Sequence, residues 1–303
     1  MFESLREVLP ADILYFQEPM KNHTTFRVGG NAAVLAEPES IQQVEDCVVH
    51  CIEKKYPYLV IGAGSNLLVS DDGYEGVVIK IAGKIKKCSI NGNQIYAEAG
   101  ISLAELSRMA AKAALTGLEF AEGIPGKLGG GLFMNAGAYG GELNDLVCRV
   151  DALNLETGEK VEVRNVRGET FGYRTSYFQK HPYIILGALL ELQPGEPEAI
   201  NARMKELSQK RKSSQPLNYP SAGSTFKRPH EPGKYAGALI DQAGLKGYRC
   251  GGAQVSEKHA GFIINYERAT AADIFHLIQD VQKKVYEFSG IHLEPEVRMI
   301  GKF

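Results

Sequence analysis

The chain has 303 residues, of which 44% are hydrophobic and 23% are charged, with a formal net charge of −2 at neutral pH. This length suits two or three domains with a sizeable core, while the near-neutral charge excludes a strongly basic nucleic-acid surface or a polybasic membrane patch. No apolar run reaches the roughly 18 residues that a membrane span needs, and the N-terminus lacks a secretory signal pattern. We therefore expect a cytoplasmic protein without nucleic-acid or membrane partners.

The five cysteines are odd in number and scattered along the chain. Only Cys47 and Cys51 lie close together, and a single C-x3-C spacing lacks the second pair of ligands that a zinc site needs. We predict no metal site and place these two residues on one face of a helix as small core residues. Reduced thiols again fit the cytosol.

Helices and strands mix irregularly along the first two thirds of the chain. Apolar residues at helical spacing over 40–54, preceded by Ser40 as an N-cap, predict a helix. Residues 102–115 predict another, with Ser102 and Glu105 as a capping box. The strands predicted here, two of them joined by the hairpin signal Asn91-Gly92-Asn93, are Tyr58–Ile61, Leu67–Val69, Gly76–Ile81, Cys88–Ile90, Ile95–Ala99, Val147–Leu155, Lys160–Val163 and Tyr183–Leu192.

The polar stretch Gln193–Glu198 predicts a boundary, after which helices dominate. Because strict β-α-β alternation is missing, the pattern favours an α+β fold over a doubly wound sheet. We expect three parts, over residues 1–81, 82–195 and 196–303. The elements predicted in the last part are helices at Ala199–Lys212, Ala236–Ala243 and 271–288, a loop at 213–234, and a strand around Leu293–Ile300.

Two glycine-rich segments are candidate ligand sites. The turn Gly62–Asn66 begins like a dinucleotide fingerprint, but Leu67 stands where the third glycine belongs and a strand is predicted to follow, so we do not expect a Rossmann site. It is either an ordinary turn or an anion-binding nest of backbone N–H groups. In Gly123–Glu142, eight of 20 residues are glycine, which indicates close approach of the backbone to a ligand or to another chain segment.

Six motifs in order carry a specific resemblance over nearly the whole chain. They are Asn22–Gly30, Gly62–Asn66, Gly123–Glu142, Gly172–Ser176, Ala222–Lys227 and Leu293–Val297. With them the chain resembles the UDP-N-acetylenolpyruvoylglucosamine reductase family, in its shorter branch without a tyrosine-loop insertion. The resemblance implies two N-terminal FAD-binding subdomains of the vanillyl-alcohol-oxidase-like type, over 1–81 and 82–195, and a C-terminal α+β substrate domain over 196–303.

The same resemblance implies non-covalent FAD, NADPH as electron donor, and reduction of UDP-N-acetylglucosamine enolpyruvate to UDP-N-acetylmuramate for peptidoglycan. Such a reaction needs a cation for the enolate, an acid beside the substrate carboxylate and a proton donor. The resemblance assigns these roles to Arg174, Glu294 and Ser224. The residues that it assigns to FAD are Arg27, Ile61, Gly62, Ala63, Gly64, Ser65, Asn66, Leu67, Gly123, Ile124, Pro125, Gly126, Gly130, Asn135, Ala136, Gly137, Ala138 and Gly140.

Substrate contacts are assigned in the same way, and two positions depart from the family pattern. Lys127 stands where the family has a small hydroxyl residue facing the flavin diphosphate, and Arg228 stands where it often has asparagine. Both cations are compatible with phosphate. The residues assigned to substrate are Tyr173, Lys212, Lys227, Arg228, Gln254 and His259.

Two other functions remain open from the residues alone. One is an FAD-linked oxidase of the same superfamily acting on a sugar or alcohol, although His and Cys, the residues that often carry a covalent flavin, are absent from Gly62–Asn66 and Gly123–Gly141. The other is a flavin-binding module without turnover, against which the combination of Arg174, Ser224 and Glu294 argues. We expect a monomer or weak oligomer.

Overall fold

The computed structural model describes residues 2–164 and 171–303 and divides into two units. The first unit contains residues 1–16, 34–63 and 76–211, and the second contains residues 17–33, 64–75 and 212–303. Each unit is therefore assembled from three chain segments. The predicted three-part division at residues 81 and 195 stays a prediction.

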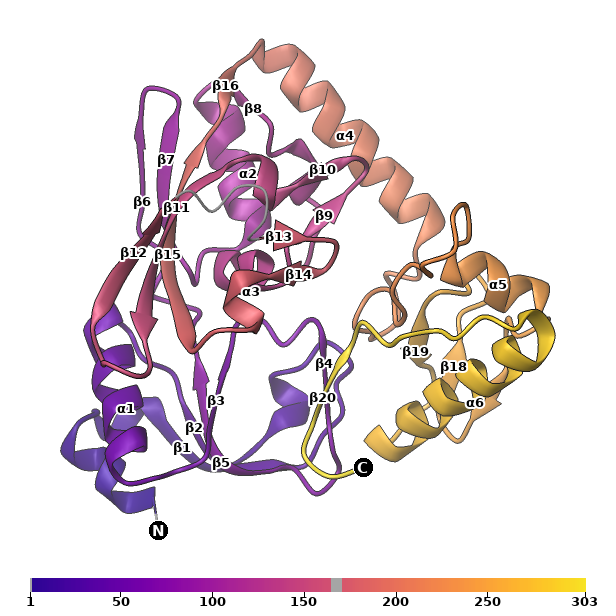
Figure 1. Cartoon of the computed structure of the whole chain (residues 1–303), viewed down its shortest axis with the longest axis horizontal. Coiled ribbons are helices and arrows are strands. Elements are labelled where there is room, and N and C mark those ends of the chain that lie inside the picture. Colours follow the sequence, from indigo (N-terminus) through magenta and orange to yellow (C-terminus); the bar gives the residue numbers. More distant parts are fainter. Residues whose placement is uncertain (1, 165–170) are drawn as a thin grey trace. The chain divides into compact units, whose positions relative to one another are not determined.

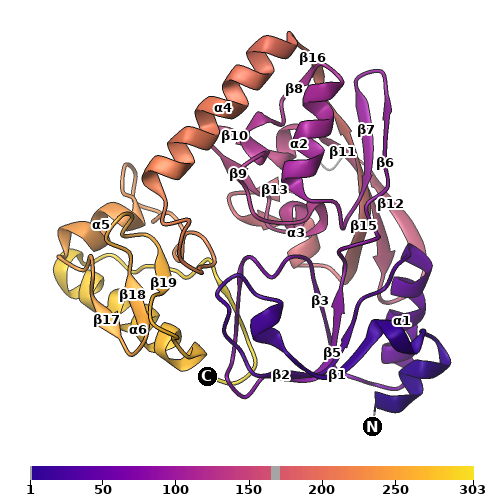
Figure 2. The same cartoon turned by 180° about the vertical axis from the view of Figure 1, so that it is seen from behind.

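A five-stranded antiparallel sheet organises the first unit, in the order β12-β11-β15-β7-β6. Its central strand β15 is the long apolar run that the sequence predicts, and six of its nine residues are buried. Helices α2 and α3 lie on the same side of this sheet (Figures 1 and 2). The strands are β6 (Cys88–Asn91), β7 (Gln94–Glu98), β11 (Val147–Asn154), β12 (Lys160–Arg164) and β15 (Tyr183–Glu191).

Two helices of the first unit begin where their serine caps predict. Ser40 accepts a hydrogen bond from the Gln43 N–H at 3.2 Å, and Ser102 accepts one from the Glu105 N–H at 3.1 Å. Cys47 and Cys51 are fully buried on α1, as predicted. The helices are α1 (Ile41–Glu53), α2 (Leu103–Lys112), α3 (Leu128–Phe133) and α4 (Pro197–Ser214), the last of which continues into the second unit.

A four-stranded sheet of order β1-β2-β5-β3 joins segments from the N-terminal third of the chain. Within it, β3 and β5 are parallel, with Tyr58 opposite Val77. Four small two-stranded pairings complete the sheets of the described residues before position 200 and at the C-terminus. The bounds are β1 (Leu14–Pro19), β2 (Asn31–Ala36), β3 (Tyr58–Ile61), β4 (Leu67–Val69), β5 (Tyr74–Lys80), β8 (Leu115–Thr116), β9 (Gly137–Ala138), β10 (Gly141–Glu142), β13 (Phe171–Gly172), β14 (Thr175–Ser176), β16 (Gln193–Pro194) and β20 (Arg298–Ile300).

Helix α6 (Ala271–Ser289) packs on a three-stranded sheet in the second unit (Figures 1 and 2). Six residues of its apolar stripe are buried, which stabilises the helix through packing. Helix α5 (Ala236–Gln242) contacts α6. The sheet contains β17 (Arg249–Cys250), β18 (Ala253–Val255) and β19 (Ile263–Asn265), and β4 pairs in parallel with β20.

The predicted strand at Leu293–Ile300 is wrong in its first half, because β20 begins only at Arg298. Pro295 has no N–H to donate to a strand partner. The segment is held instead by the Lys227 N–H, which donates to the Glu294 carbonyl at 2.8 Å, and by the Glu296 N–H, which donates to the Thr225 carbonyl at 2.8 Å. Glu294 therefore lies in a loop, where its side chain is exposed.

The N-terminus of α6 is capped by a residue about 200 positions earlier in the chain. Asp71 accepts hydrogen bonds from the N–H groups of Ala271 and Ala272, each at 2.9 Å, and both partners belong to the second unit. Asp71→Ala is expected to destabilise this unit by about 0.5–2 kcal/mol, because two helix N–H donors lose a charged acceptor.

Urea unfolding together with amide exchange in the first turn of α6 measures that loss. The exposed neighbour Asp72 gives the matched control Asp72→Ala. Equal exchange in the two variants would contradict a capping role for Asp71.

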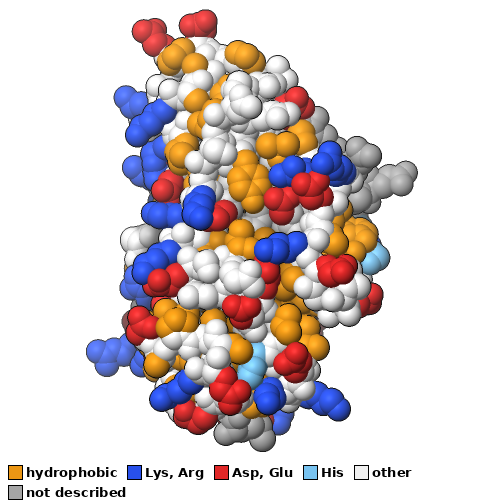
Figure 3. Space-filling model, turned by 90° about the vertical axis from the view of Figure 1, so that its left-hand side faces the viewer, with side chains coloured by type: hydrophobic (Ala, Val, Ile, Leu, Met, Phe, Trp, Pro, Cys, Tyr) orange, Lys and Arg blue, Asp and Glu red, His pale blue; other side chains and the backbone are white. Residues whose placement is uncertain are grey.

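On the face shown in Figure 3, acidic and basic side chains alternate among hydrophobic ones over the atoms that the view colours. This mixture agrees with the net charge of −2. Among the helices of the described residues, none is both long enough and apolar enough to cross a membrane. Nor do His, Cys, Asp and Glu side chains in that part of the chain gather in a group that could hold a metal ion.

Candidate active site

The glycine-rich stretch contains a short helix that the sequence does not predict. Helix α3 begins after Lys127, where the Leu128 N–H donates to the Ile101 carbonyl and the Gly129 N–H donates to the Ala99 carbonyl, both at 2.9 Å. A methyl group on Gly129 would lie 2.9 Å from the Ala99 side chain, and one on Gly131 would lie 2.9 Å from Leu143. Tight chain packing therefore explains these two glycines.

Two other glycines of the stretch face open space. A methyl group on Gly130 or Gly140 would meet no atom within 4 Å. The Gly130 N–H, unlike its two predecessors in α3, has no backbone acceptor among the described residues. Gly140 has a φ of +91°, a conformation that suits glycine. Close chain packing does not require glycine here, which leaves room for a bound ligand.

Lys127 places a cation beside both glycine segments of the first unit. Its Cβ and Cγ carbons lie 3.2 and 3.3 Å from the position of a Gly62 Cβ. Burial lowers the pKa of Lys127, as do the charges of Lys86 and Lys80, against the opposing effect of Glu105. The cation and the open backbone at Gly130 form a donor set suited to a diphosphate.

Arg211 is a second cation next to the stretch, and no sequence motif indicates it. Its Cδ carbon lies 2.8 Å from where a Gly123 Cβ would stand, so glycine at position 123 makes room for the arginine. Burial lowers the pKa of Arg211, while the nearby Tyr139 raises it. Arg211 lies near the end of α4, and the order of residues in this helix does not reveal that Arg211 packs against Gly123.

The Gly62–Asn66 turn is divided between the two units. In the second unit, Gly64 has a φ of +64° and its Cβ position lies 2.0 Å from the His23 carbonyl oxygen, so only glycine fits there. The Asn66 side chain donates to the Glu296 carbonyl at 3.0 Å, and its role toward FAD stays a prediction. Arg27 is exposed with a φ of +57°.

Ile61 and Leu67 border this turn as strand residues. Ile61 ends β3, is buried, and pairs with Lys80. Leu67 begins β4 opposite Arg298. The Ile61 carbonyl already accepts from the Ile81 N–H at 2.8 Å, and Leu67 is only partly buried. Their roles toward FAD stay predictions.

Asn135 and Arg174 both lie in the first unit, and each donates to a backbone carbonyl there. Asn135 is fully buried with a φ of +44°, and its side chain bonds to backbone atoms of Gly172 and Asn144. Arg174 donates to the Gly137 carbonyl at 3.2 Å, and its guanidinium lies 5.2 Å from the centre of the exposed Tyr173 ring. Five further residues assigned to FAD lie on the same stretch around α3, namely Ile124, Pro125, Gly126, Ala136 and Ala138, whereas Ala63 follows Gly62 at the end of another segment of this unit.

Ser224 and Glu294 lie on two neighbouring segments of the second unit. The bridge between Phe226 and Pro295 joins these segments, and the Lys227 ammonium forms an ion pair with the Glu294 carboxylate. Ser224 is exposed after Gly223, whose φ is +79°. Within the described chain, the Ser224 hydroxyl has no hydrogen-bond partner, so it does not cap the local backbone.

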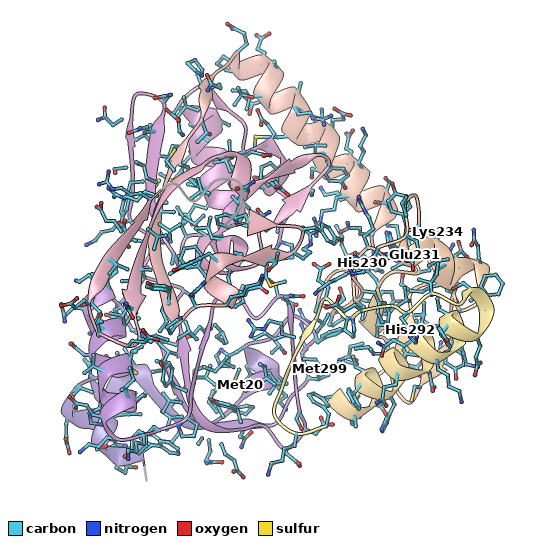
Figure 4. All side chains as sticks on the ribbon, in the orientation of Figure 1. Met20, His230, Glu231, Lys234, His292 and Met299 are labelled. Carbon is cyan, nitrogen blue, oxygen red and sulfur yellow. The ribbon has the colours of Figure 1, made fainter. Side chains whose placement is uncertain are left out.

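The remaining substrate candidates of the second unit differ in accessibility. Lys212 and Arg228 are exposed, and Arg228 lies 5.0 Å from the Tyr235 ring centre. The exposed residues His230, Glu231 and Lys234 follow on the segment that leads to α5 (Figure 4). This polar segment therefore presents charged groups to solvent.

Gln254 and His259 are tied into the fold of the second unit. Gln254 is buried and donates to the Gly247 carbonyl at 3.3 Å. His259 accepts from the Gly261 N–H through Nδ1 at 3.1 Å and packs edge-on against Phe262. Burial lowers the pKa of His259, which favours its neutral form. Their substrate roles stay predictions, and their visible contacts are structural.

Comparison with known proteins gives matches along the whole chain. Residues 32–164 match a family model described as FAD binding domain, and residues 215–300 match one described as UDP-N-acetylenolpyruvoylglucosamine reductase, C-terminal domain. A UDP-N-acetylenolpyruvoylglucosamine reductase from Caldanaerobacter subterraneus is 46% identical over 302 residues, which cover 100% of this chain and 98% of the relative. The chain belongs to this reductase family.

Further relatives of the family agree in sequence and fold. The reductase of Alkaliphilus oremlandii is 47% identical over 99% of this chain and 98% of its own length. The crystal structure of UDP-N-acetylenolpyruvylglucosamine reductase from Thermus caldophilus matches with a TM-score of 0.80 and 35% identity, covering 95% of this chain and 98% of that one. The predicted α+β fold, with FAD-binding and C-terminal reductase regions, is confirmed.

Proposed function

We propose that this chain is the FAD-dependent enzyme that reduces UDP-N-acetylglucosamine enolpyruvate to UDP-N-acetylmuramate, with NADPH as electron donor, in peptidoglycan synthesis. The observation that carries the proposal is family membership at 46% identity over the whole chain. It favours the reductase over an oxidase or a module without turnover, because two family models match in order along one chain.

The donor set of the first unit fits FAD. The open backbone at Gly130 and Gly140 leaves space for the cofactor, and the half-buried cation of Lys127 suits its diphosphate. When bound, FAD carries two electrons from NADPH to the substrate. The protein supplies the position and the charge.

The residues of the chain supply the remaining chemistry. Hydride addition at the β carbon of the enolpyruvyl ether breaks its carbon–carbon double bond and leaves negative charge on the carboxylate side. We assign Arg174 to stabilise that charge through its fixed N–H donors. Ser224 protonates the α carbon, and this role is supported because its hydroxyl has no hydrogen-bond partner among the described residues.

Glu294 is assigned to the substrate carboxylate as a hydrogen-bonding acid. In the structure its side chain is exposed and paired with Lys227. The role therefore depends on bound substrate excluding water and taking over the lysine contact. Lys227 then serves as a second cation for the substrate.

The test separates flavin binding from reduction. The flavin is released from the purified protein by heat or acid, and NADPH oxidation is followed with and without the UDP-enolpyruvyl sugar. A colourless protein that cannot be reconstituted with FAD would overturn the cofactor assignment. Flavin that is reduced by NADPH but not reoxidised by the sugar would overturn the reductase assignment.

Lys127→Met is expected to weaken FAD binding by about tenfold and to make the remaining affinity less dependent on salt, because a half-buried cation near a diphosphate is lost. Titration of apoprotein with FAD, followed by flavin fluorescence at two salt concentrations, measures both effects. Lys112→Met, an exposed lysine on α2, is the matched control. Unchanged affinity and salt dependence would mean that Lys127 points away from the cofactor.

We also propose that the chain acts in the cytoplasm as a monomer or weak oligomer, without nucleic-acid or membrane partners. Five free cysteines support a reducing compartment. The mixed surface charge and the formal net charge of −2 support the absence of nucleic-acid partners.

A further inference from the structure

The Tyr173-Arg174 pair forms the tip of a tight hairpin in the first unit. Strands β13 and β14 pair Gly172 with Thr175, so only two residues make the turn. Arg174 occupies its second position with a φ of +54°. Glycine or asparagine normally occupies such a left-handed position, and an arginine there is retained only where surrounding contacts fix it.

One side of the hairpin is held by Asn135. Its Nδ2 donates to the Gly172 carbonyl at 3.0 Å, while its Oδ1 accepts from the Asn144 N–H at 3.1 Å. Asn135 itself is fully buried and has a φ of +44°. A single amide thus joins the glycine-rich stretch to the start of the Arg174 turn, and it uses one donor and one acceptor to do so.

The other side is held by Gln179. Its Nε2 donates to the Phe133 carbonyl at 2.7 Å and to the Arg174 carbonyl at 3.1 Å. The Ser176 hydroxyl donates to the same Phe133 carbonyl at 2.7 Å. The end of α3 is therefore hydrogen-bonded to the far side of the turn.

The guanidinium is also bonded to the stretch. Arg174 Nη2 donates to the Gly137 carbonyl at 3.2 Å. Asn135 bonds to the Gly172 carbonyl before the turn, and Gln179 joins the Arg174 carbonyl to Phe133. The Ser176 hydroxyl and the Arg174 guanidinium bond directly to the carbonyls of Phe133 and Gly137. All of these residues belong to one unit of the structure. A turn held at so many points has little freedom to reorient.

We propose that Asn135 and Gln179 are positioning residues that fix the Arg174 turn on the glycine-rich stretch, so that the guanidinium is preorganised for the enolpyruvyl carboxylate. The inference rests on the proposed function for the identity of the substrate. It gives Asn135 a role through Arg174, because its buried amide bonds to the Gly172 carbonyl at one end and to the Asn144 N–H at the other.

The first measurement does not depend on activity. Gln179→Leu keeps side-chain size at an exposed position but removes both bonds, and Asn135→Gly tolerates the positive φ while removing the amide. Amide exchange over residues 171–179 is expected to accelerate in both variants, with the FAD dissociation constant little changed. Lys180→Gln, an exposed neighbour, is the control. Unchanged amide exchange in both variants would show that Asn135 and Gln179 do not fix the Arg174 turn, whatever the enzyme reduces.

The second measurement, the turnover rate, tests whether fixing the Arg174 turn matters for the reaction. Each variant is expected to lose about ten- to a hundredfold in turnover with the UDP-enolpyruvyl sugar, because small displacements of a catalytic group carry costs of that order. The loss is expected to disappear when Gln179→Leu is added to Arg174→Lys, since the same group has then already lost its fixed geometry. Additive losses would overturn positioning through Arg174.

The two proposals can fail separately. If amide exchange accelerates in the variants but the unmutated protein does not reduce the sugar, only the proposed function is contradicted. The positioning of the Arg174 turn by Asn135 and Gln179 would still hold. Asn135→Gly variants that lose FAD before exchange changes would show instead that Asn135 acts on the cofactor.

Discussion

Ser224→Ala is expected to slow reduction of the UDP-enolpyruvyl sugar by about 10²–10⁴-fold, the range typical for loss of a general acid. The rate at which NADPH reduces the bound flavin is expected to change little. The two rates diverge because the hydroxyl serves only the protonation of the α carbon. Stopped-flow absorbance of the flavin, with NADPH alone and then with the sugar added to reduced protein, measures each rate separately.

The structure makes Ser224 a good subject for this test. Its backbone is fixed by its neighbour Thr225, whose N–H donates to the Gly261 carbonyl at 2.8 Å and whose hydroxyl accepts from the Ile263 N–H at 3.0 Å. The Ser224 hydroxyl has no such bond among the described residues, so alanine removes no structural contact. Ser208→Ala on α4 is the matched control. Equal slowing of both half-reactions would show that Ser224 is not a dedicated proton donor.

The sequence predicts most of the regular structure because the local signals agree with the packing. Local sequence signals predict the Ser40 and Ser102 caps, the apolar strand β15 and the apolar stripe of α6. All four are confirmed. The hairpin at Asn91-Gly92-Asn93 forms with Ile90 opposite Ile95, as its turn residues predict.

Helix α3 is not predictable in this way, because three of its six residues are glycine. It forms because Gly129 and Gly131 pack against Ala99 and Leu143, contacts made by distant parts of the chain. The strand predicted over Leu293–Ile300 is shortened for a different reason. Pro295 has no N–H for a strand ladder, so this segment makes only an isolated bridge to Phe226 before β20 begins at Arg298.

In the candidate site, too, some residues are found from sequence motifs and others only from the structure. The glycine-rich stretch, Arg174 and Ser224 are found from motifs. Gln179 carries no signal in the sequence, because its partner Phe133 lies 46 residues away. The division of the predicted catalytic residues between the units, with Arg174 in the first and Ser224 and Glu294 in the second, is likewise a property of the fold.

Arg174→Lys is expected to lower turnover with the UDP-enolpyruvyl sugar by about 10²–10³-fold, comparable to the loss of one preorganised donor to a developing anion. Lysine keeps the charge but loses the rigid fork of N–H donors that matches a carboxylate. A large effect from this substitution would therefore come from geometry more than from net charge. The loss is expected mainly in kcat, because the interaction strengthens as charge develops on the substrate.

Steady-state kinetics with varied sugar concentration measure kcat and KM for Arg174→Lys, and Lys180→Gln controls for removal of a nearby exposed cation. Protein stability is expected to be nearly unchanged, because lysine keeps the positive charge at this partly exposed position. A rise in KM with unchanged kcat would contradict the assignment, since it would show that Arg174 binds substrate and transition state equally. If kcat falls while NADPH still reduces the flavin at the normal rate, Arg174 acts in the reduction of the sugar, the same half-reaction as Ser224. The two residues belong to different units of the fold.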